Sequence, residues 1–192
     1  MFLSTFEKQL DSKRRIVVPQ EFRAAVSGPF DGIFCFPSIE ADCLEAGGKA
    51  LSDAREALPE LRPGVRCECG DAKTTVGGDL PARFVIHAVG PNYRGFREEA
   101  DPGNPDEGPG DVEDEFMADG LLYSAYQCAM VEARTQKMAS VGFSLLSSGI
   151  FRGRRPLGAV LRIGVLAIAA NAYPGLEEVV MVGFNEKEID AL

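Results

Sequence analysis

The sequence predicts an α/β fold in which helices flank a mixed or largely parallel sheet, with a β-hairpin attached at the N-terminus. Three nearly continuous apolar runs, at 82–89, 140–146 and 178–184, are typical of strands that are buried on both faces of a sheet. Helical patterns at 117–138 and 157–173 separate these runs. Because strands and helices alternate, we expect parallel pairing through right-handed crossovers.

The first 30 residues predict a hairpin followed by a helix. Residues 2–9 alternate as a strand does, a polar turn follows at 11–13, and the β-branched residues of 15–19 resume the strand. Pro19 then opens a helical stretch, since proline is tolerated in the first turn of a helix. The Ser-Gly-Pro sequence at 27–29 ends this stretch.

Two more elements and one loop complete the pattern. Residues 32–37 predict another short apolar strand, and 39–58 predicts a helix that is interrupted at Gly47-Gly48. Residues 98–115 hold nine acidic residues, three prolines and three glycines, with no Lys or Arg. This composition cannot bury enough apolar area to fold, so we expect a solvated acidic loop.

The charge of the chain restricts its partners. A net charge of -9 and a pI near 4.7 argue against general affinity for nucleic acids, which requires an excess of Lys and Arg. Residues 1–27 differ, because five basic and three acidic side chains give them a balance of +2. Only this first segment is suited to face a polyanion.

Cysteine content and hydropathy predict the compartment. Five cysteines, and a start without a basic and then apolar leader pattern, favour a reduced cytoplasmic or nuclear setting. The longest apolar stretch, 157–172, contains Arg162, so no membrane span is expected. Cys67-Glu68-Cys69 is too tight for the usual zinc spacing, and we expect neither a metal nor a cofactor.

Residues 10–19, Leu-Asp-Ser-Lys-Arg-Arg-Ile-Val-Val-Pro, resemble the Asp-x-x-x-Arg signature of the MraZ family of bacterial transcriptional regulators, which is related to AbrB-type swapped-hairpin proteins. The resemblance spans residues 1–50 and implies a DNA-facing turn, where arginine can bond bidentately to guanine. The family carries two such half-repeats and this chain has one, so a DNA-binding unit requires another subunit. The alternative is a solvated basic hairpin without a partner. The DNA-binding candidates are Asp11, Lys13, Arg14 and Arg15.

The rest of the chain resembles macro domains, the ADP-ribose-binding family. The stretches that carry this resemblance are 67–75, 78–91, 140–153 and 179–184. It implies a three-layer sandwich around a mostly parallel sheet, and domains at 1–50 and 51–192.

The chemistry of one turn agrees with this resemblance. A strand that ends at Leu146 and continues as Ser147-Ser148-Gly149-Ile150-Phe151 brings small residues and free backbone N–H groups to the carboxyl edge of a sheet, where a pyrophosphate can approach. The alternative is a plain strand-to-helix connection. The resemblance adds Gly70, Asp71, Ala72, Phe184 and Asn185, with Phe184 at the position that packs on adenine or, alternatively, in the core. His87 lies within an apolar strand, which favours a core histidine over a catalytic one.

Several elements that macro domains normally have do not occur upstream of Gly47. They are a Gly-Asp pair, an Asn-Ala-Ala-Asn segment and a Gly-rich loop, which in hydrolytic members hold the ribose and the attacking water. We therefore assign no catalytic residue and expect no hydrolysis. Our hypothesis for the join between the MraZ-like and the macro-like part is that the MraZ-like strand at 33–36 takes the place of the missing central strand of the macro-type sheet. Without such a strand, the edges of its neighbours would be exposed.

The sequence thus favours a module that binds ADP-ribose or a related nucleotide diphosphate, with a DNA-binding appendage and a capacity to form homo-oligomers. Binding that is weakened or lost stays open. A second hypothesis is a MraZ-like DNA-binding transcriptional regulator. A third is a chimeric or designed fusion without an evolved function.

Overall fold

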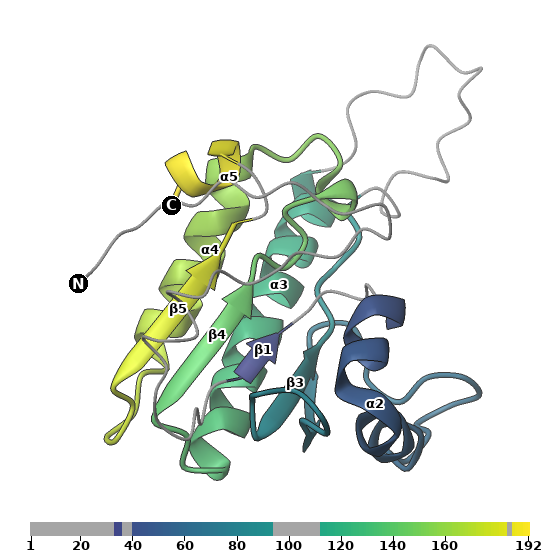
Figure 1. The fold of residues 1–192 in the computed structure, drawn as a ribbon. Helices are drawn as coiled ribbons and strands as arrows, with labels where there is room; N and C mark the ends of the chain where they lie inside the picture. The colour runs from purple at the N-terminus through teal and green to yellow at the C-terminus, as the bar shows by residue number, and fades with distance from the viewer. Residues whose placement is uncertain (1–32, 36–39, 94–111, 184–185) are drawn as a thin grey trace. The chain divides into compact units, whose positions relative to one another are not determined.

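The computed structural model describes residues 33–35, 40–93, 112–183 and 186–192 of the chain (Figure 1). Asp31–Leu192 forms one compact unit. Its sheet has five strands in the order β2-β3-β1-β4-β5. The strands are β1 (Ile33–Cys35), β2 (Ala72–Val76), β3 (Phe84–Ala88), β4 (Ser140–Ser144) and β5 (Glu178–Val182).

The pairing in this sheet is mostly parallel. The short strand β1 lies between β3 and β4 and is parallel to both, with Phe34 in register with Val85 on one side and with Gly142 on the other. β5 continues the parallel order beside β4. β1 therefore has the central position that the hypothesis for the join required.

The strand β2 is antiparallel to β3 at the edge of the sheet, and the sequence pattern did not predict it. Its residues Lys73, Thr74 and Thr75 are polar, because an edge strand needs less apolar surface than a central one. The Thr74 hydroxyl reaches α3, where it donates to Glu132 Oε2 over 2.7 Å. The turn at 77–83 links β2 directly to β3.

The described helices are α2 (Glu40–Glu56), α3 (Val112–Thr135), α4 (Leu157–Ala170) and α5 (Glu186–Asp190). In Figure 1, α3 and α4 lie side by side behind the sheet, and α2 lies beside β2 and β3. α3 begins at Val112, so residues 112–115 are helical and not part of the acidic loop that was predicted there. Acidic residues are favourable in the first turn of a helix, which explains this difference. None of these described helices is long and apolar enough to cross a membrane.

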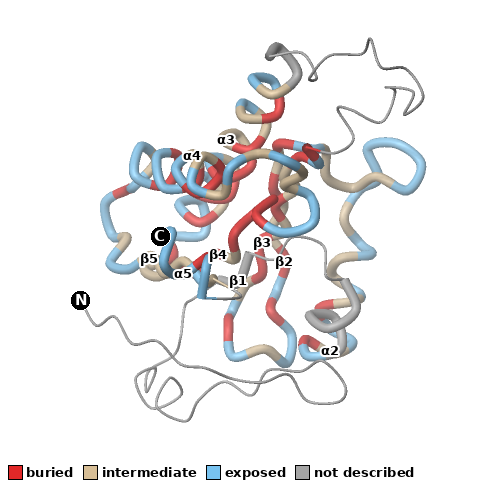
Figure 2. Tube along the Cα trace, turned by 90° about the horizontal axis from the view of Figure 1, so that it is seen from above, coloured by how far each residue is buried: buried red, intermediate tan, exposed pale blue. Residues whose placement is uncertain are grey.

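The core lies between the sheet and α3, where Figure 2 shows the buried residues concentrated. Tyr126 of α3 and Phe143 of β4 are fully buried, with ring centroids 5.4 Å apart. The Tyr126 hydroxyl accepts a hydrogen bond from the Leu146 N–H over 2.9 Å. One aromatic side chain thus ties the central helix to the end of β4.

The predicted interruption of α2 is a kink at Gly48, whose φ of 63° lies in the left-handed region. The turn between β2 and β3 packs into this kink: the Asp79 N–H donates to the Gly47 carbonyl over 2.9 Å. A Cβ atom on Gly78 would lie 2.1 Å from the same carbonyl oxygen. Glycines on both sides therefore permit the close approach of helix and turn.

Two helical glycines give a matched test of this packing. A Cβ on Gly164 of α4 would lie 2.8 Å from two atoms of the Tyr126 ring, whereas a Cβ on exposed Gly120 of α3 would meet nothing within 4 Å. We expect Gly164→Ala to lower the free energy of unfolding by about 1–2 kcal/mol, because the held ring cannot move away. Gly120→Ala should raise it by up to about 1 kcal/mol through helix propensity. Urea unfolding measures both, and equal stability of the two variants would contradict the packing described.

Candidate functional site

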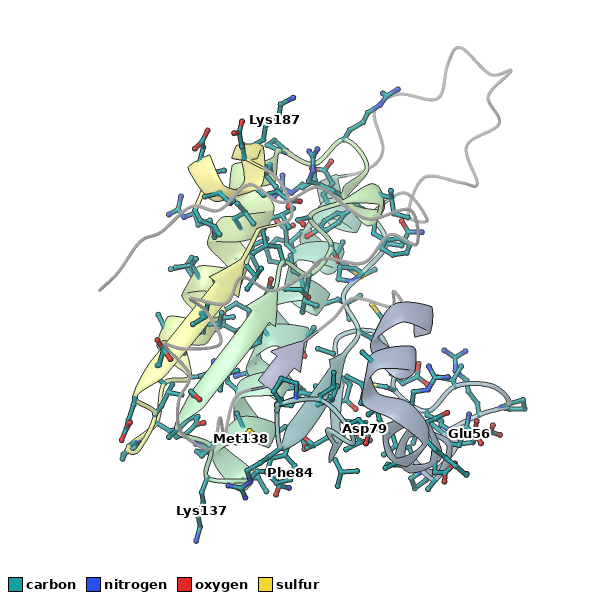
Figure 3. The ribbon with its side chains drawn as sticks, in the orientation of Figure 1. Glu56, Asp79, Phe84, Lys137, Met138 and Lys187 are labelled. Carbon is teal, nitrogen blue, oxygen red and sulfur yellow. The ribbon has the colours of Figure 1, made fainter. Side chains whose placement is uncertain are left out.

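The carboxyl ends of the parallel strands meet at one edge of the sheet. Figure 3 shows this edge near Lys187 of α5, opposite Phe84 and Met138, which lie at the amino ends of β3 and β4. Segments 89–93, after β3, and 145–153, after β4, leave the sheet here. Ligands of parallel α/β sheets bind outside such carboxyl edges. We refer to residues 145–152 as the β4 turn.

The carbonyl groups of the β4 turn face the protein. Leu145 O accepts from the Ser148 hydroxyl over 3.0 Å, and Phe151 O accepts from the Tyr93 N–H over 2.8 Å. Ser148 O accepts from Arg152 Nε over 3.0 Å, and Gly149 O accepts from the Arg152 N–H over 3.1 Å. Four carbonyl oxygens of the turn are therefore occupied by protein donors.

Three consecutive amide groups of the same turn, at 149–151, face outward. Within the described residues, the N–H groups of Gly149, Ile150 and Phe151 have no hydrogen-bond acceptor. A Cβ on Gly149 would meet no atom within 4 Å, and the Ile150 side chain is 70% exposed. Outward N–H groups in an open turn form an anion-binding concavity. The turn is thus open where the sequence predicted a pyrophosphate to approach.

Ser147 joins the loops that follow β3 and β4. It is buried and has a φ of 56°, which is uncommon for a residue with a side chain. Its hydroxyl donates to the Pro91 carbonyl over 2.7 Å. A Cβ on Gly90 would lie 2.5 Å from the Ser147 hydroxyl oxygen, so glycine is needed opposite it. The hydrogen bond holds a backbone conformation that costs about 1–3 kcal/mol.

A carboxylate on α3 supports both loops from below. Asp119 Oδ1 accepts from the Tyr93 hydroxyl over 2.9 Å and from Arg155 Nε over 3.2 Å, and Arg155 Nη2 bonds the second carboxylate oxygen. Arg155 also pairs with Glu115 over 3.4 Å. Burial, and then the hydrogen bond to Asp119, raise the pKa of Tyr93. Asp119 thereby fixes the segment after β3 relative to the segment after the β4 turn.

The short helix α5 contacts the turn from the other side. Ser148 Oγ lies 3.0 Å from Oε1 of the buried Glu188 and donates toward it. The predicted ligand residues Phe184 and Asn185 lie just before α5 and outside the described residues. The DNA-binding candidates Asp11, Lys13, Arg14 and Arg15 also lie outside them.

The candidates Gly70, Asp71 and Ala72 lie at the same edge, with β3 and β1 between them and β4. The Asp71 carboxylate pairs with Lys73 Nζ over 2.6 Å and accepts from the Ala72 N–H over 2.8 Å. Ala72 is buried in the core. Their role in ligand binding stays a prediction.

Sequence reasoning missed the residues that hold the turn in shape: Tyr93, Asp119, Arg152, Arg155 and Glu188. One signal was present in the sequence. Three arginines, Arg152, Arg154 and Arg155, lie within four residues of each other at the end of the turn, although the chain is acidic overall. The partners on α3 and α5 are distant in sequence and carry no such signal.

His87 is a core residue within β3. Its Nε2 lies 2.8 Å from Thr75 Oγ1 on β2, and burial lowers the pKa of His87 to about 4, with a smaller contribution from the charge of Arg55. Among the thiols described, burial raises the pKa of Cys67 to about 11, so this thiol is not reactive at neutral pH. No group of three or more His, Cys, Asp or Glu residues is placed to hold a metal in the described ranges.

Macro domains match most of the chain. The family model "Macro domain" matches residues 38–104. A macro domain-containing protein of Cupriavidus necator is 30% identical over 171 residues, which are 89% of this chain and 87% of the relative. A macro domain-containing protein of Xanthomonas axonopodis pv. citri is 32% identical over 150 residues, with 77% and 73% covered.

Solved macro domains have the same fold. The Oceanobacillus iheyensis macrodomain with ADP superposes with a TM-score of 0.61 at 22% identity, over 85% of this chain and 81% of the other. The macro domain of ganglioside-induced differentiation-associated protein 2 gives a TM-score of 0.64 at 23% identity, over 85% and 74%.

A second set of relatives matches a shorter segment. The transcriptional regulator MraZ of Caulobacter vibrioides is 87% identical over 63 residues, and that of Phenylobacterium zucineum is 85% identical over 60 residues. These matches cover 33% and 31% of this chain. The chain spans about two fifths of the length of these regulators, 40% and 38%.

The buried His87 predicts a specific loss of stability in acid. Its pKa is about 4 in the folded chain and 6.5 as the ordinary value, so the unfolded chain binds more protons between these pH values. Stability is therefore lost as the pH falls from about 6.5 to about 4, by up to about 3 kcal/mol from this group. His87→Gln can keep the bond to Thr75 without titrating. We expect a flatter dependence of the unfolding free energy on pH in this variant, and parallel curves for both proteins would refute the assignment.

Proposed function

Because the chain belongs to the macro domain family, we propose that it binds ADP-ribose or a related nucleoside diphosphate at the carboxyl edge of its sheet. The observation that carries the proposal is the outward set of N–H groups at Gly149, Ile150 and Phe151. Among similar folds, the Oceanobacillus macrodomain was solved with ADP, and a Trypanosoma brucei macrodomain, with a TM-score of 0.53, in complex with ADP-ribose.

Neutral donors suit an anionic ligand in this acidic chain. The net charge of -9 disfavours long-range attraction of a diphosphate, so affinity must come from short-range contacts. Hydrogen bonds to charged groups contribute about 1.5–3 kcal/mol each, and three N–H groups converge on the turn. The donors are already oriented, which reduces the ordering cost on binding.

The adenosine portion of such a ligand requires further contacts. We assign these to Phe184 and Asn185 after β5, and to Gly70, Asp71 and Ala72 at the start of β2, on their resemblance to macro-domain positions. Aromatic stacking on a base contributes about 1–3 kcal/mol. The proposal concerns binding and includes no chemical step.

Filling the space above the turn tests the proposal. We expect ADP-ribose to bind wild-type protein saturably in calorimetry and to raise its thermal midpoint. Gly149→Val should weaken binding by about tenfold or more, because the valine side chain occupies the open space beside three N–H groups that donate to the anion. Gly120→Ala, at an equally open glycine on α3, should bind like wild type. Absence of heat and of a thermal shift at millimolar ADP-ribose would exclude useful binding by the wild-type protein.

We propose DNA binding by the N-terminal segment as a second function. The observation that favours it is 87% identity over 63 residues to transcriptional regulators. Lys13, Arg14 and Arg15 give this segment the cations that phosphate contacts need, whereas the rest of the chain is acidic. A single half-repeat would act with that of a second copy of the chain.

A gel shift with random-sequence duplex DNA tests the second function. We expect a complex that weakens with added salt, and Arg15→Ala should abolish it or reduce the salt slope by about one. The matched control is Arg154→Gln, which removes one exposed positive charge from the macro part and should leave the shift unchanged. Equal effects of both changes would indicate non-specific attraction only. Failure of both the nucleotide and the DNA experiments would favour a fusion without an evolved function.

A further inference from the structure

Three arginines lie at the end of the β4 turn and just after it, and each has a different environment. Arg155 is paired with Asp119 and Glu115. Arg154 is exposed and has no polar partner among the described residues. Arg152 is half-buried, and its guanidinium donates to the Ser148 and Arg155 carbonyl oxygens, with no carboxylate partner in the described part of the chain. Among the described residues, therefore, no carboxylate compensates the charge of Arg152, whereas two compensate that of Arg155.

The bonds of Arg152 fix two consecutive peptide groups. Its Nε holds the Ser148 carbonyl over 3.0 Å, and its own backbone N–H holds the Gly149 carbonyl over 3.1 Å. No peptide bond is cis, and in a trans peptide group the C=O and the N–H point in opposite directions. An inward Ser148 carbonyl therefore requires an outward Gly149 N–H. In the same way, an inward Gly149 carbonyl requires an outward Ile150 N–H.

Without this restraint the turn has an alternative state. Glycine has few steric limits on its backbone, so the peptide group between Ser148 and Gly149 can rotate and direct its carbonyl oxygen outward. An outward carbonyl would repel a phosphate oxygen, whereas the outward N–H attracts it. The space above Gly149 is open, so no described neighbour prevents the rotation.

We propose that Arg152 is the positioning residue that makes the β4 turn selective for phosphate-bearing ligands. Its guanidinium holds the Ser148–Gly149 peptide group, and its backbone N–H holds the Gly149–Ile150 peptide group, so that the Gly149 and Ile150 N–H groups converge on the anion. Its charge has no carboxylate partner among the described residues. The inference rests on the proposed nucleotide function. It adds that Arg152 makes the site prefer a diphosphate to an uncharged nucleoside.

Four proteins separate positioning from charge: wild type, Arg152→Lys, Arg152→Gln and Arg154→Gln. Calorimetry with ADP and an NMR titration with adenosine measure the phosphate-dependent part of the affinity. We expect Arg152→Gln to lose about tenfold or more for ADP, with adenosine affinity unchanged within about twofold. Arg152→Lys keeps the positive charge but lacks the planar guanidinium with its several fixed donors, so it should lose less ADP affinity than Arg152→Gln but more than none. Arg154→Gln should bind ADP within about twofold of wild type.

Backbone amide NMR of the ligand-free protein gives an independent readout. The Gly149 resonance should be sharp in wild type and in Arg154→Gln, and broadened or doubled in Arg152→Gln by rotation of the Ser148–Gly149 peptide group. The Ile150 resonance should stay sharp in all three proteins, because the backbone N–H of residue 152 still holds its peptide group. Inorganic pyrophosphate should shift both resonances in wild type.

Two results would overturn the inference. One is an equal loss of ADP affinity in Arg152→Gln and Arg154→Gln with full recovery in Arg152→Lys, which would assign the effect to charge alone. The other is an equal loss for ADP and adenosine with a lower thermal midpoint, which would assign it to stability. If wild-type protein binds neither ADP nor ADP-ribose, the proposed function fails, and the ligand-free spectra still decide whether Arg152 orients the turn.

Discussion

The backbone pairing of β1 with strands on both sides is the constraint on which the rest of the described structure depends. Only three residues, Ile33–Cys35, connect β3 to β4 across the middle of the sheet. Without them the sheet would be two pieces with four edges, and unpaired edges invite association with other chains. The site depends on the same strand, because β1 sets the distance at which the loops after β3 and β4 meet through Ser147 and Pro91.

The segment that supplies β1 is similar to two sequence families. The Cupriavidus match leaves 21 of 192 residues uncovered, so it includes residues 31–50 wherever it begins. A 63-residue MraZ match cannot lie beside a 171-residue macro match in this chain, so the two overlap. A short central strand makes modest demands on sequence, because its hydrogen bonds come from the backbone and its side chains need only be apolar. This tolerance explains how an MraZ-like segment can complete a macro-type sheet. The helix α2, which follows β1, spans residue 50, where the sequence predicted a domain boundary.

The elements that the sequence predicts well are those with dense apolar periodicity. The runs at 82–89 and 140–146 became β3 and β4, each with three of five residues buried, and the helix at 157–173 became α4, which buries five of its 14 residues along one side. The strand β2 was not predicted, because it lacks an apolar run: its polar side chains form hydrogen bonds to individual residues, as Thr75 does to His87. Of the candidate site, the small residues of the β4 turn were recognisable, whereas the supports on α3 and α5 depend on contacts 26 to 40 residues apart in sequence. Such contacts follow from the fold and leave no local pattern.

The site consists of peptide groups, and side chains serve mainly to orient them. Tyr93, Arg152 and Ser148 each occupy a carbonyl oxygen of the β4 turn. The two carbonyl groups that Arg152 occupies, at Ser148 and Gly149, direct the N–H groups of Gly149 and Ile150 to the outside. Since these donors are neutral, an acidic chain can present them without a basic patch. Glu188 contacts the turn directly and Asp119 holds it through Tyr93, and both carboxylates lie within residues 112–192, as does the turn itself. The β4 turn of a macro-type fold can therefore keep its shape when the segment that precedes it is MraZ-like, provided that β1 keeps the two loops in register.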